Sequence, residues 1–250
     1  MVANLQETDD IRNGRGMALV FCAGVLWSTI GLGIRFIETA TVWQILLYRS
    51  ASLVFFLSVV MFVRSGQNPL RQVYLAGLPA CVAGLALVGA YSGGIYAIQT
   101  TTVAKAMLLF AAAPFLAAIL GWIFLNEVVK RSTGVAIFVA SIGIAIMVIG
   151  QTEGGALIGT LAGLGSALGF AIFTVALRWG KSADMMPSIL LSGLFAIIIT
   201  ICVCWQTGLS FVIRPNGASI LMAIGIFQVG ADLILYTLGS KTVPAAELAL

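Results

Sequence analysis

Apolar and polar positions alternate along this chain on the scale of whole helices, not of single residues. From Met17 onward, apolar blocks are separated only by short polar segments, several of which contain Gly or Pro. A helix of roughly 20 residues rises about 30 Å, which is the thickness of the hydrocarbon core of a bilayer. The pattern predicts membrane-crossing helices at 17–37, 42–63, 73–97, 102–125, 132–150, 157–177, 186–206 and 218–239, and a ninth that begins near 243.

Composition agrees with this pattern and narrows the class of protein. Hydrophobic residues make up 60% of the chain and charged residues only 9%, whereas soluble proteins average about 25% charged residues. The mean hydropathy is +1.09. A soluble fold of 250 residues could not bury this much apolar surface, so the chain is predicted to be an all-α polytopic membrane protein. The lipid bilayer is then its first partner.

Basic residues predict the orientation. Short loops on the cytoplasmic side of a membrane protein carry the excess of Lys and Arg. With a cytoplasmic N-terminus, nine basic residues fall inside and two, Arg35 and Arg214, fall outside. The nine are Arg12, Arg15, Arg64, Arg71, Lys130, Arg131, Arg178, Lys181 and Lys241. We therefore expect a multi-pass protein of the cell (inner) membrane, with residues 1–16 as a cytoplasmic tail.

The chain also resembles itself. The segment from Gly16 through Trp27 to Arg35 aligns with residues 159–178 at a shift of 143, so that Trp27 matches Phe170. The segment 96–108 aligns with 236–248 at a shift of 140, and Tyr96 matches Tyr236. Five predicted spans separate the two copies, and an odd number makes the second copy enter the membrane from the opposite side. This predicts an inverted repeat, an arrangement found in many secondary transporters.

Several sequence stretches carry a resemblance to a known family. They are GVLWSTIGLGIRF at 24–36, TTVAKAMLLFAAAPFLAAILGWIFLNE ending at Glu127, VVKRSTGVAIFVASIGIAIMV at 128–148 and KTVPAAELAL at 241–250. With them the chain resembles the EamA-type transporters of the drug/metabolite transporter superfamily. The resemblance implies a ten-helix fold of two five-helix halves. We then expect a first repeat at 17–150 and a second at 156–250, with the sequence truncated within helix 9.

Residue types that the chain lacks exclude several chemistries. It contains no histidine, and neither HExxH, GxSxG nor a Walker A sequence is present. The four cysteines lie inside apolar blocks without the spacing of a metal site or a disulfide framework. We therefore expect no enzyme, no metal and no cofactor. The net charge of +4 is explained by the orientation of the spans, so nucleic acid is not an expected partner.

Polar residues within spans are the best indicators of a site, because a charge at the bilayer centre is costly. Four ionisable residues lie inside spans: Arg49, Lys105, Asp232 and Glu247. In the repeat alignment Lys105 and Glu247 fall two positions apart on equivalent helices, so symmetry would place these opposite charges near the central axis. The resemblance further implies that helices 3, 4, 8 and 9 line the cavity. The expected substrate-binding residues are Ser92, Tyr96, Lys105, Gln228, Asp232, Tyr236 and Glu247.

Each of these residues has an architectural alternative. Tyr96 and Tyr236 would suit an amphipathic metabolite, or would anchor span ends at the membrane surface. Asp232 and Glu247 are candidates for proton coupling; alternatively, Asp232 is paired with a polar neighbour and Glu247 is solvated. Lys105 could extend to the interface. Arg49 stays open between packing and function.

The function predicted from these features is secondary transport of a small-molecule substrate by alternating access. The resemblance favours export of amino acids or amphipathic drugs. The alternatives are a membrane-embedded enzyme and a non-transporting membrane partner protein. Neither the coupling ion nor the oligomeric state can be derived from the sequence.

Overall fold

The computed structural model describes residues 16–19, 21–35, 37, 40–126, 131–149, 154–180, 184–232, 234 and 235. These residues form helices and their connections, and no strand occurs among them. By length and composition, six helices could cross a membrane. They are Gly16–Ile34, Val42–Ser65, Pro69–Thr100, Val103–Leu125, Leu157–Trp179 and Met186–Thr207. Two shorter apolar helices, Ile137–Ile146 and Pro215–Ala231, match the fifth and eighth predicted spans, which confirms a polytopic helical membrane protein; the ninth predicted span lies outside the described residues.

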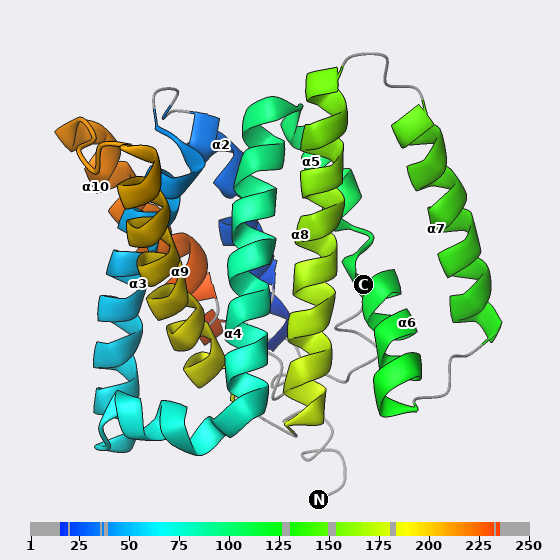
Figure 1. The fold of residues 1–250 in the computed structure, drawn as a ribbon. Coiled ribbons are helices and arrows are strands. Elements are labelled where there is room, and N and C mark those ends of the chain that lie inside the picture. Colours follow the sequence, from blue (N-terminus) through cyan, green and yellow to red (C-terminus); the bar gives the residue numbers. More distant parts are fainter. Residues whose placement is uncertain are drawn as a thin grey trace, which may run out of the picture.

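The helices follow one another as up-and-down rods joined by short connections (Figure 1). In chain order they are α2 (Ile30–Arg35), α3 (Val42–Ser65), α4 (Pro69–Thr100), α5 (Val103–Phe110), α6 (Ala113–Leu125), α7 (Arg131–Ile149), α8 (Gly154–Trp179), α9 (Met186–Thr207), α10 (Pro215–Ala223) and the π-helix η1 (Ile224–Ala231). At the centre, α4 packs against both α8 and α9, and α3 packs against α9 and α4. Helix α7 contacts α6 and lies at the edge of the bundle (Figure 1).

Helix α4 differs from the prediction, which placed residues 64–72 in a loop. Asn68 caps the helix by accepting a hydrogen bond from the Leu70 backbone N–H at 2.9 Å, so the helix begins at Pro69. Its 32 residues would measure about 48 Å if straight, which exceeds the hydrocarbon thickness. A break at Gly77 (φ 67°), followed by Pro79, resolves this excess. The part before the break lies across the lower end of the bundle in Figure 1.

The fourth predicted span is interrupted next to Pro114. Helix α5 ends at Phe110, and α6 begins at Ala113 with Pro114 in its first turn. Proline has no N–H to donate to the preceding turn, so one helix ends and another starts there. The eighth span changes type within itself, because α10 continues as the π-helix η1. Nothing in the sequence pattern distinguished that π-helix from an α-helix.

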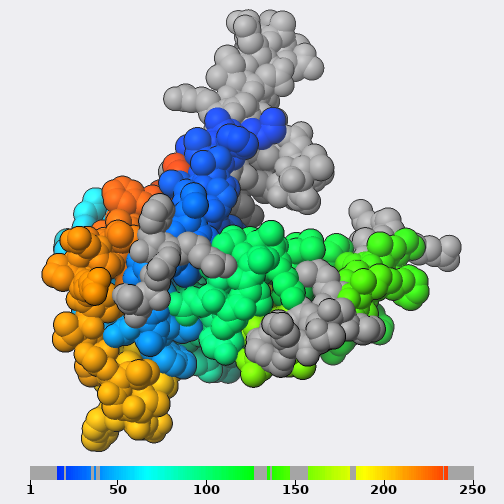
Figure 2. Space-filling model, turned by 90° about the horizontal axis from the view of Figure 1, so that it is seen from above, coloured from blue at the N-terminus to red at the C-terminus, as the bar shows by residue number. Residues whose placement is uncertain are grey.

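The two ends of the bundle can be identified from contacts between elements. We call the end where α3 finishes and α9 begins the lower face, as drawn in Figure 1. There Arg64 Nη1 donates to Met186 Sδ at 3.4 Å. At the opposite, upper face, Gln99 Nε2 at the end of α4 donates to the Ala40 carbonyl at 2.8 Å. Viewed from above, the blue α2 and the orange α10 lie side by side on this face (Figure 2).

Small residues let α4 and α8 approach closely. The Gly169 Cα faces the backbone of α4, and a Cβ there would lie 2.7 Å from the Ala86 carbonyl oxygen. One turn earlier, Ser166 Oγ donates to the Ala90 carbonyl at 2.6 Å. Without a strong hydrophobic force between helices in lipid, such packing and interhelical hydrogen bonding hold them together. Gly169 therefore lies at the close approach of the two helices, whereas Gly165 on the same helix faces open space.

These two glycines provide a direct test of the packing. We expect Gly169→Ala to destabilise the protein by about 1–3 kcal/mol, because the added methyl group overpacks against backbone that cannot yield. Gly165→Ala is the matched control and should be neutral, or stabilising by up to about 1 kcal/mol, through helix propensity. Thermal unfolding of the purified proteins in detergent measures both. Equal effects of the two changes would contradict the close approach of α4 and α8.

Candidate functional site

A single cation lies deep among the described helices. Arg49 belongs to α3, seven residues and therefore about 10 Å after its first residue, and its side chain is 1% exposed. Its Nε and Nη2 atoms have no hydrogen-bond partner among the described residues. Arginine remains charged in proteins, so this is a buried cation with unsatisfied donors. Buried cations of this kind call for an acceptor.

One neighbour stabilises this cation in part. The ring of Tyr91 on α4 covers the guanidinium, with 4.0 Å between the ring centroid and Arg49 Cζ. A cation–π contact contributes about 0.5–2 kcal/mol. It acts on the face of the guanidinium and accepts none of the hydrogen bonds in its plane. Leaving buried donors unpaired costs about 1–3 kcal/mol, and more for a charged group. The cation–π contact with Tyr91 therefore leaves the in-plane N–H donors of Arg49 without acceptors among the described residues.

The π-helix η1 packs directly on α3 at this level. Gly225 meets the backbone of Arg49 and the hydroxyl of Ser52, and a side chain at Gly225 would collide with both. Three residues later, Gln228 is 4% exposed, and its Oε1 atom has no partner within the described structure. Single-turn π segments occur frequently at functional sites. Among the described residues, α3 thus carries a buried unpaired donor edge, and η1, which packs on it, carries a buried unpaired acceptor.

A carboxylate lies in the same neighbourhood. Asp232 directly follows η1 and is half-buried. Tyr91 interacts electrostatically with both Arg49 and Asp232, so the phenol lies within reach of the two opposite charges. We call Arg49, Tyr91, Gln228 and Asp232 the central polar cluster. It joins α3, α4 and η1 with its following turn, in the interior of the bundle.

The structure brings together only part of the predicted site. Gln228 and Asp232 belong to the cluster, and Ser92 is the neighbour of Tyr91, although its hydroxyl donates to the Gly89 carbonyl at 3.2 Å. Tyr96 is 37% exposed, one turn before the end of α4. Lys105 lies in the first turn of α5, half-buried.

Two predicted residues, Tyr236 and Glu247, lie outside the described residues. The expected proximity of Glu247 to Lys105, and the equivalence of Tyr236 with Tyr96, therefore stay predictions.

Three buried or partly buried polar residues were missed or left undecided by the sequence analysis. Tyr91 was overlooked, although it directly precedes the predicted Ser92; an aromatic residue next to in-span polar residues was the available signal. Thr200 on α9 is fully buried, and its hydroxyl has no partner among the described residues. The sequence identified Arg49 as a charged residue inside a span. Its burial, and the lack of a hydrogen-bond acceptor for Nε and Nη2 among the described residues, distinguish it from a packing residue. No group of three or more potential metal-ligating residues occurs in the described part of the chain.

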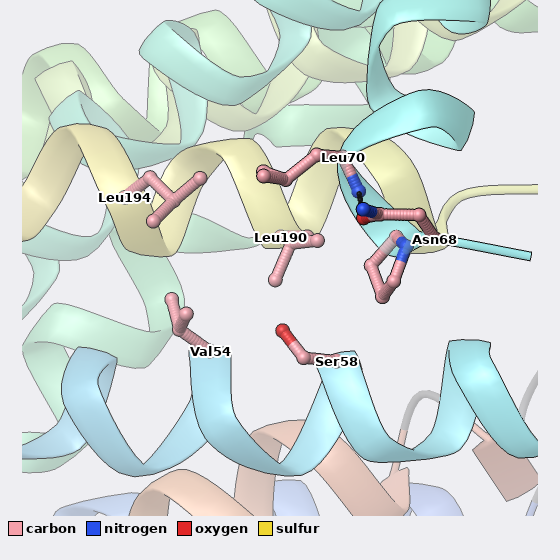
Figure 3. Close-up of a pocket in the computed structure, with 7 residues that line it drawn as sticks. Val54, Ser58, Asn68, Leu70, Leu190 and Leu194 are labelled. Atoms are coloured by element: carbon pink, nitrogen blue, oxygen red, sulfur yellow. Dashed lines mark hydrogen bonds between the residues drawn. The ribbon is translucent and has the colours of Figure 1, made fainter.

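Cavities lie elsewhere, toward the lower face. One of about 310 Å³ opens between α3, α9 and the start of α4 (Figure 3). Val54 and Ser58 face Leu190 and Leu194 across it. A second, of about 150 Å³, is more polar; it is lined by Met61, Arg64, Ser65, Gln72, Asp184 and Met186. The first is almost entirely apolar, whereas the second is lined by both a cation and a carboxylate, Arg64 and Asp184.

The stacking of Tyr91 on Arg49 can be tested through stability. We expect Tyr91→Leu to destabilise the purified protein by about 1–2 kcal/mol more than Tyr91→Phe, because phenylalanine keeps an aromatic face over the cation and leucine does not. Unfolding in detergent at two salt concentrations measures the difference. If phenylalanine and leucine have the same effect, the ring contributes only volume.

Comparison with known proteins identifies the family. The model of the EamA-like transporter family matches residues 14–149, more than half of the chain. No curated protein matches. A solved structure described as "Crystal structure of protein" is similar in fold, with a TM-score of 0.62 at 17% identity; the alignment covers 93% of this chain and 82% of that one. The chain belongs to the EamA-like transporter family.

Proposed function

We propose that this membrane transporter is a secondary carrier that exports small metabolites, such as amino acids or amphipathic drugs, by alternating access between two inverted halves. Membership of the family makes the chain a membrane transporter and implies a small-molecule substrate. The observation that carries the proposal further is the direction of the helices. Equivalent helices of the two predicted halves run in opposite senses.

Three pairs of helices support this. The first span ends at the upper face, where Gly31 meets Val103 of α5; α8 begins at that face, where Gly159 meets Thr100 of α4. Helix α3 ends at the lower face, where α9 begins. Helix α4 begins at the lower face, whereas α10 begins at the upper face, where Gly217 approaches Ile37. Opposite senses in successive pairs are what an inverted repeat requires.

Contacts between equivalent residues support a two-fold axis. A residue can touch its own symmetry equivalent only close to the axis. Trp27 and Phe170, which match at a shift of 143, have ring centroids 5.8 Å apart. Ser50 and Gly193 are also 143 positions apart and meet where α3 packs on α9. The packing of α4 on α9 also has a symmetry equivalent. It is the packing of α10 and η1, which correspond to α4, on α3, which corresponds to α9.

The two faces differ in how tightly they are held. At the upper face, Gln44 Nε2 donates to the Ser210 carbonyl at 2.7 Å, and the Tyr48 hydroxyl donates to the Phe211 carbonyl at 3.1 Å. The two cavities described above lie toward the lower face. A carrier that is closed by hydrogen bonds at one face and open at the other would show this difference between its faces. With the N-terminus cytoplasmic in the inner membrane, as the basic residues indicate, the lower face, which holds the cavities, is the cytoplasmic one.

Within this carrier, Gln228 and Asp232 line the path and bind substrate, and Asp232 exchanges a proton during the cycle. Their support is position: both lie on the element that packs against α3 in the bundle interior, and Gln228 has an unpaired acceptor. Ser92, Tyr96, Lys105, Tyr236 and Glu247 are proposed as further substrate-binding residues, with Glu247 as a second proton-coupling group. The symmetry of the repeat supports Tyr96 and Lys105 in this role.

Counterflow in proteoliposomes tests the proposal. The full chain should exchange internal unlabelled amino acid for external labelled amino acid, and flux should depend on pH if a proton is coupled. Asp232→Asn should remove the pH dependence, because the amide cannot exchange a proton. Asp184→Asn, an exposed carboxylate at the lower face, is the control and should leave it intact. A panel of amino acids and amphipathic drugs that gives no flux at any pH contradicts transport; unchanged pH dependence in Asp232→Asn contradicts the coupling role.

A further inference from the structure

The two unpaired nitrogens of Arg49 lie on the same edge of the guanidinium. Nε and Nη2 direct parallel N–H bonds outward from that edge, and both lack an acceptor among the described residues. Two parallel N–H bonds match the two oxygens of a carboxylate, which is why arginine binds carboxylates in a bidentate manner. The unoccupied edge therefore has the donor pattern of a carboxylate-binding group.

The edge is buried and unpaired among the described residues, and one face of the guanidinium is covered by a ring. Tyr91 occupies a face of the guanidinium at 4.0 Å, which fixes its plane but not its in-plane hydrogen bonds. On η1, which packs against α3, Gln228 carries a buried Oε1 acceptor that also lacks a donor among the described residues. A donor and an acceptor that remain unpaired on two elements in contact indicate that a third group belongs in this part of the bundle.

We propose that Arg49 binds the carboxylate of the transported substrate, and that Tyr91 holds the guanidinium in the orientation that presents its Nε–Nη2 edge. This inference rests on the proposed function and names the substrate class: small metabolites with a free carboxylate. Asp232 lies within electrostatic reach of the same tyrosine, so a substrate ammonium group has a partner of opposite sign nearby. The pair selects zwitterions, such as α-amino acids, over amines and amides.

The proposal also explains why a cation is kept here at all. A buried charge without a partner destabilises a protein, and a hydrophobic residue of similar volume is then often tolerated better. Purely structural packing between α3, α4 and η1 could be achieved by leucine or methionine at this position. An arginine whose Nε and Nη2 donors find no acceptor in the described part of the chain is therefore better explained by a bound group than by packing.

Binding to the purified full-length chain is the first test. L-leucine, L-threonine and L-phenylalanine are each compared with their carboxamides in a thermal-shift measurement in detergent. The acids should raise the Tm of the wild type and the carboxamides should not. Arg49→Gln should weaken the effect of the acids by about a hundredfold in apparent Kd, the loss expected when one partner of a buried charge pair is removed. Arg71→Gln, an exposed arginine in the first turn of α4, is the matched control and should bind as the wild type does.

A second variant separates binding from folding. Arg49→Met should have a ligand-free Tm equal to or above that of the wild type, because it removes an unpaired buried cation. A Tm lowered by several degrees would instead show that the arginine already has a partner within the protein, and would overturn the proposal. Equal stabilisation by acids and carboxamides, or by neither, would overturn it as well.

Flux measurements distinguish this inference from the proposed function. Transport of amino acids and carboxamides at equal rates, unaffected by Arg49→Gln, overturns the carboxylate site and leaves the carrier intact. Binding that depends on the carboxylate and on Arg49, in a protein that gives no counterflow, supports the site and contradicts transport. Carboxylate-selective flux that falls together with binding in Arg49→Gln supports both.

Discussion

The constraint on which this structure depends is the cost of holding a guanidinium in the bundle interior when the described helices offer its Nε and Nη2 atoms no acceptor. In lipid, every backbone group of a spanning helix is satisfied within that helix, so buried side-chain charges stand out as the groups still to be satisfied. Arg49 is such a group, and three elements converge on it. Helix α4 supplies the ring of Tyr91, η1 supplies the glycine that lets the chains approach, and α3 supplies the cation itself.

Close packing makes this convergence possible. Gly225 allows η1 to lie against the backbone of α3 beside Arg49, and Gly169 allows α8 to lie against α4. A π-helix also displaces the side chains that follow it relative to a regular α-helix. Gln228 is buried on an element whose hydrogen bonding differs from that of α10 before it.

Much of the fold could be predicted from the sequence, because the signal for a spanning helix is its length and apolarity. The predicted span 186–206 and the observed Met186–Thr207 differ by a single residue. The kink before Pro114 followed from the chemistry of proline. The prediction failed at the start of α4, where capping by Asn68 and the freedom of Gly77 create a helical arm from residues that look like a loop. Local hydrogen bonding decided that segment, and hydropathy does not report it.

The site was predictable only as far as charge inside a span identifies it. Asp232 was found in this way. The importance of Arg49 depends on whether its donors are paired, and pairing is a property of tertiary geometry. Tyr91 matters because its ring lies over that arginine, a relation between residues 42 positions apart on different helices. Spacing along one helix cannot reveal such a relation.

The proposed repeat gives the central polar cluster a further meaning, because the two halves are unequal where the charges lie. At a shift of 143, Arg49 corresponds to Ser192, whose hydroxyl donates to the Ile189 carbonyl of its own helix at 2.7 Å. At a shift of 140, Asp232 corresponds to Ser92, which likewise bonds to its own helix. Within the central polar cluster, each half thus contributes one charge, and the two charges have opposite signs. Each charged residue corresponds to a serine in the other half. Near-equal scaffolds allow the halves to exchange packing, whereas unequal residues at the centre give a bound zwitterion a defined orientation. The symmetric backbone would then allow the two halves to exchange conformations, and the different residues at these two pairs of positions would determine which substrate binds.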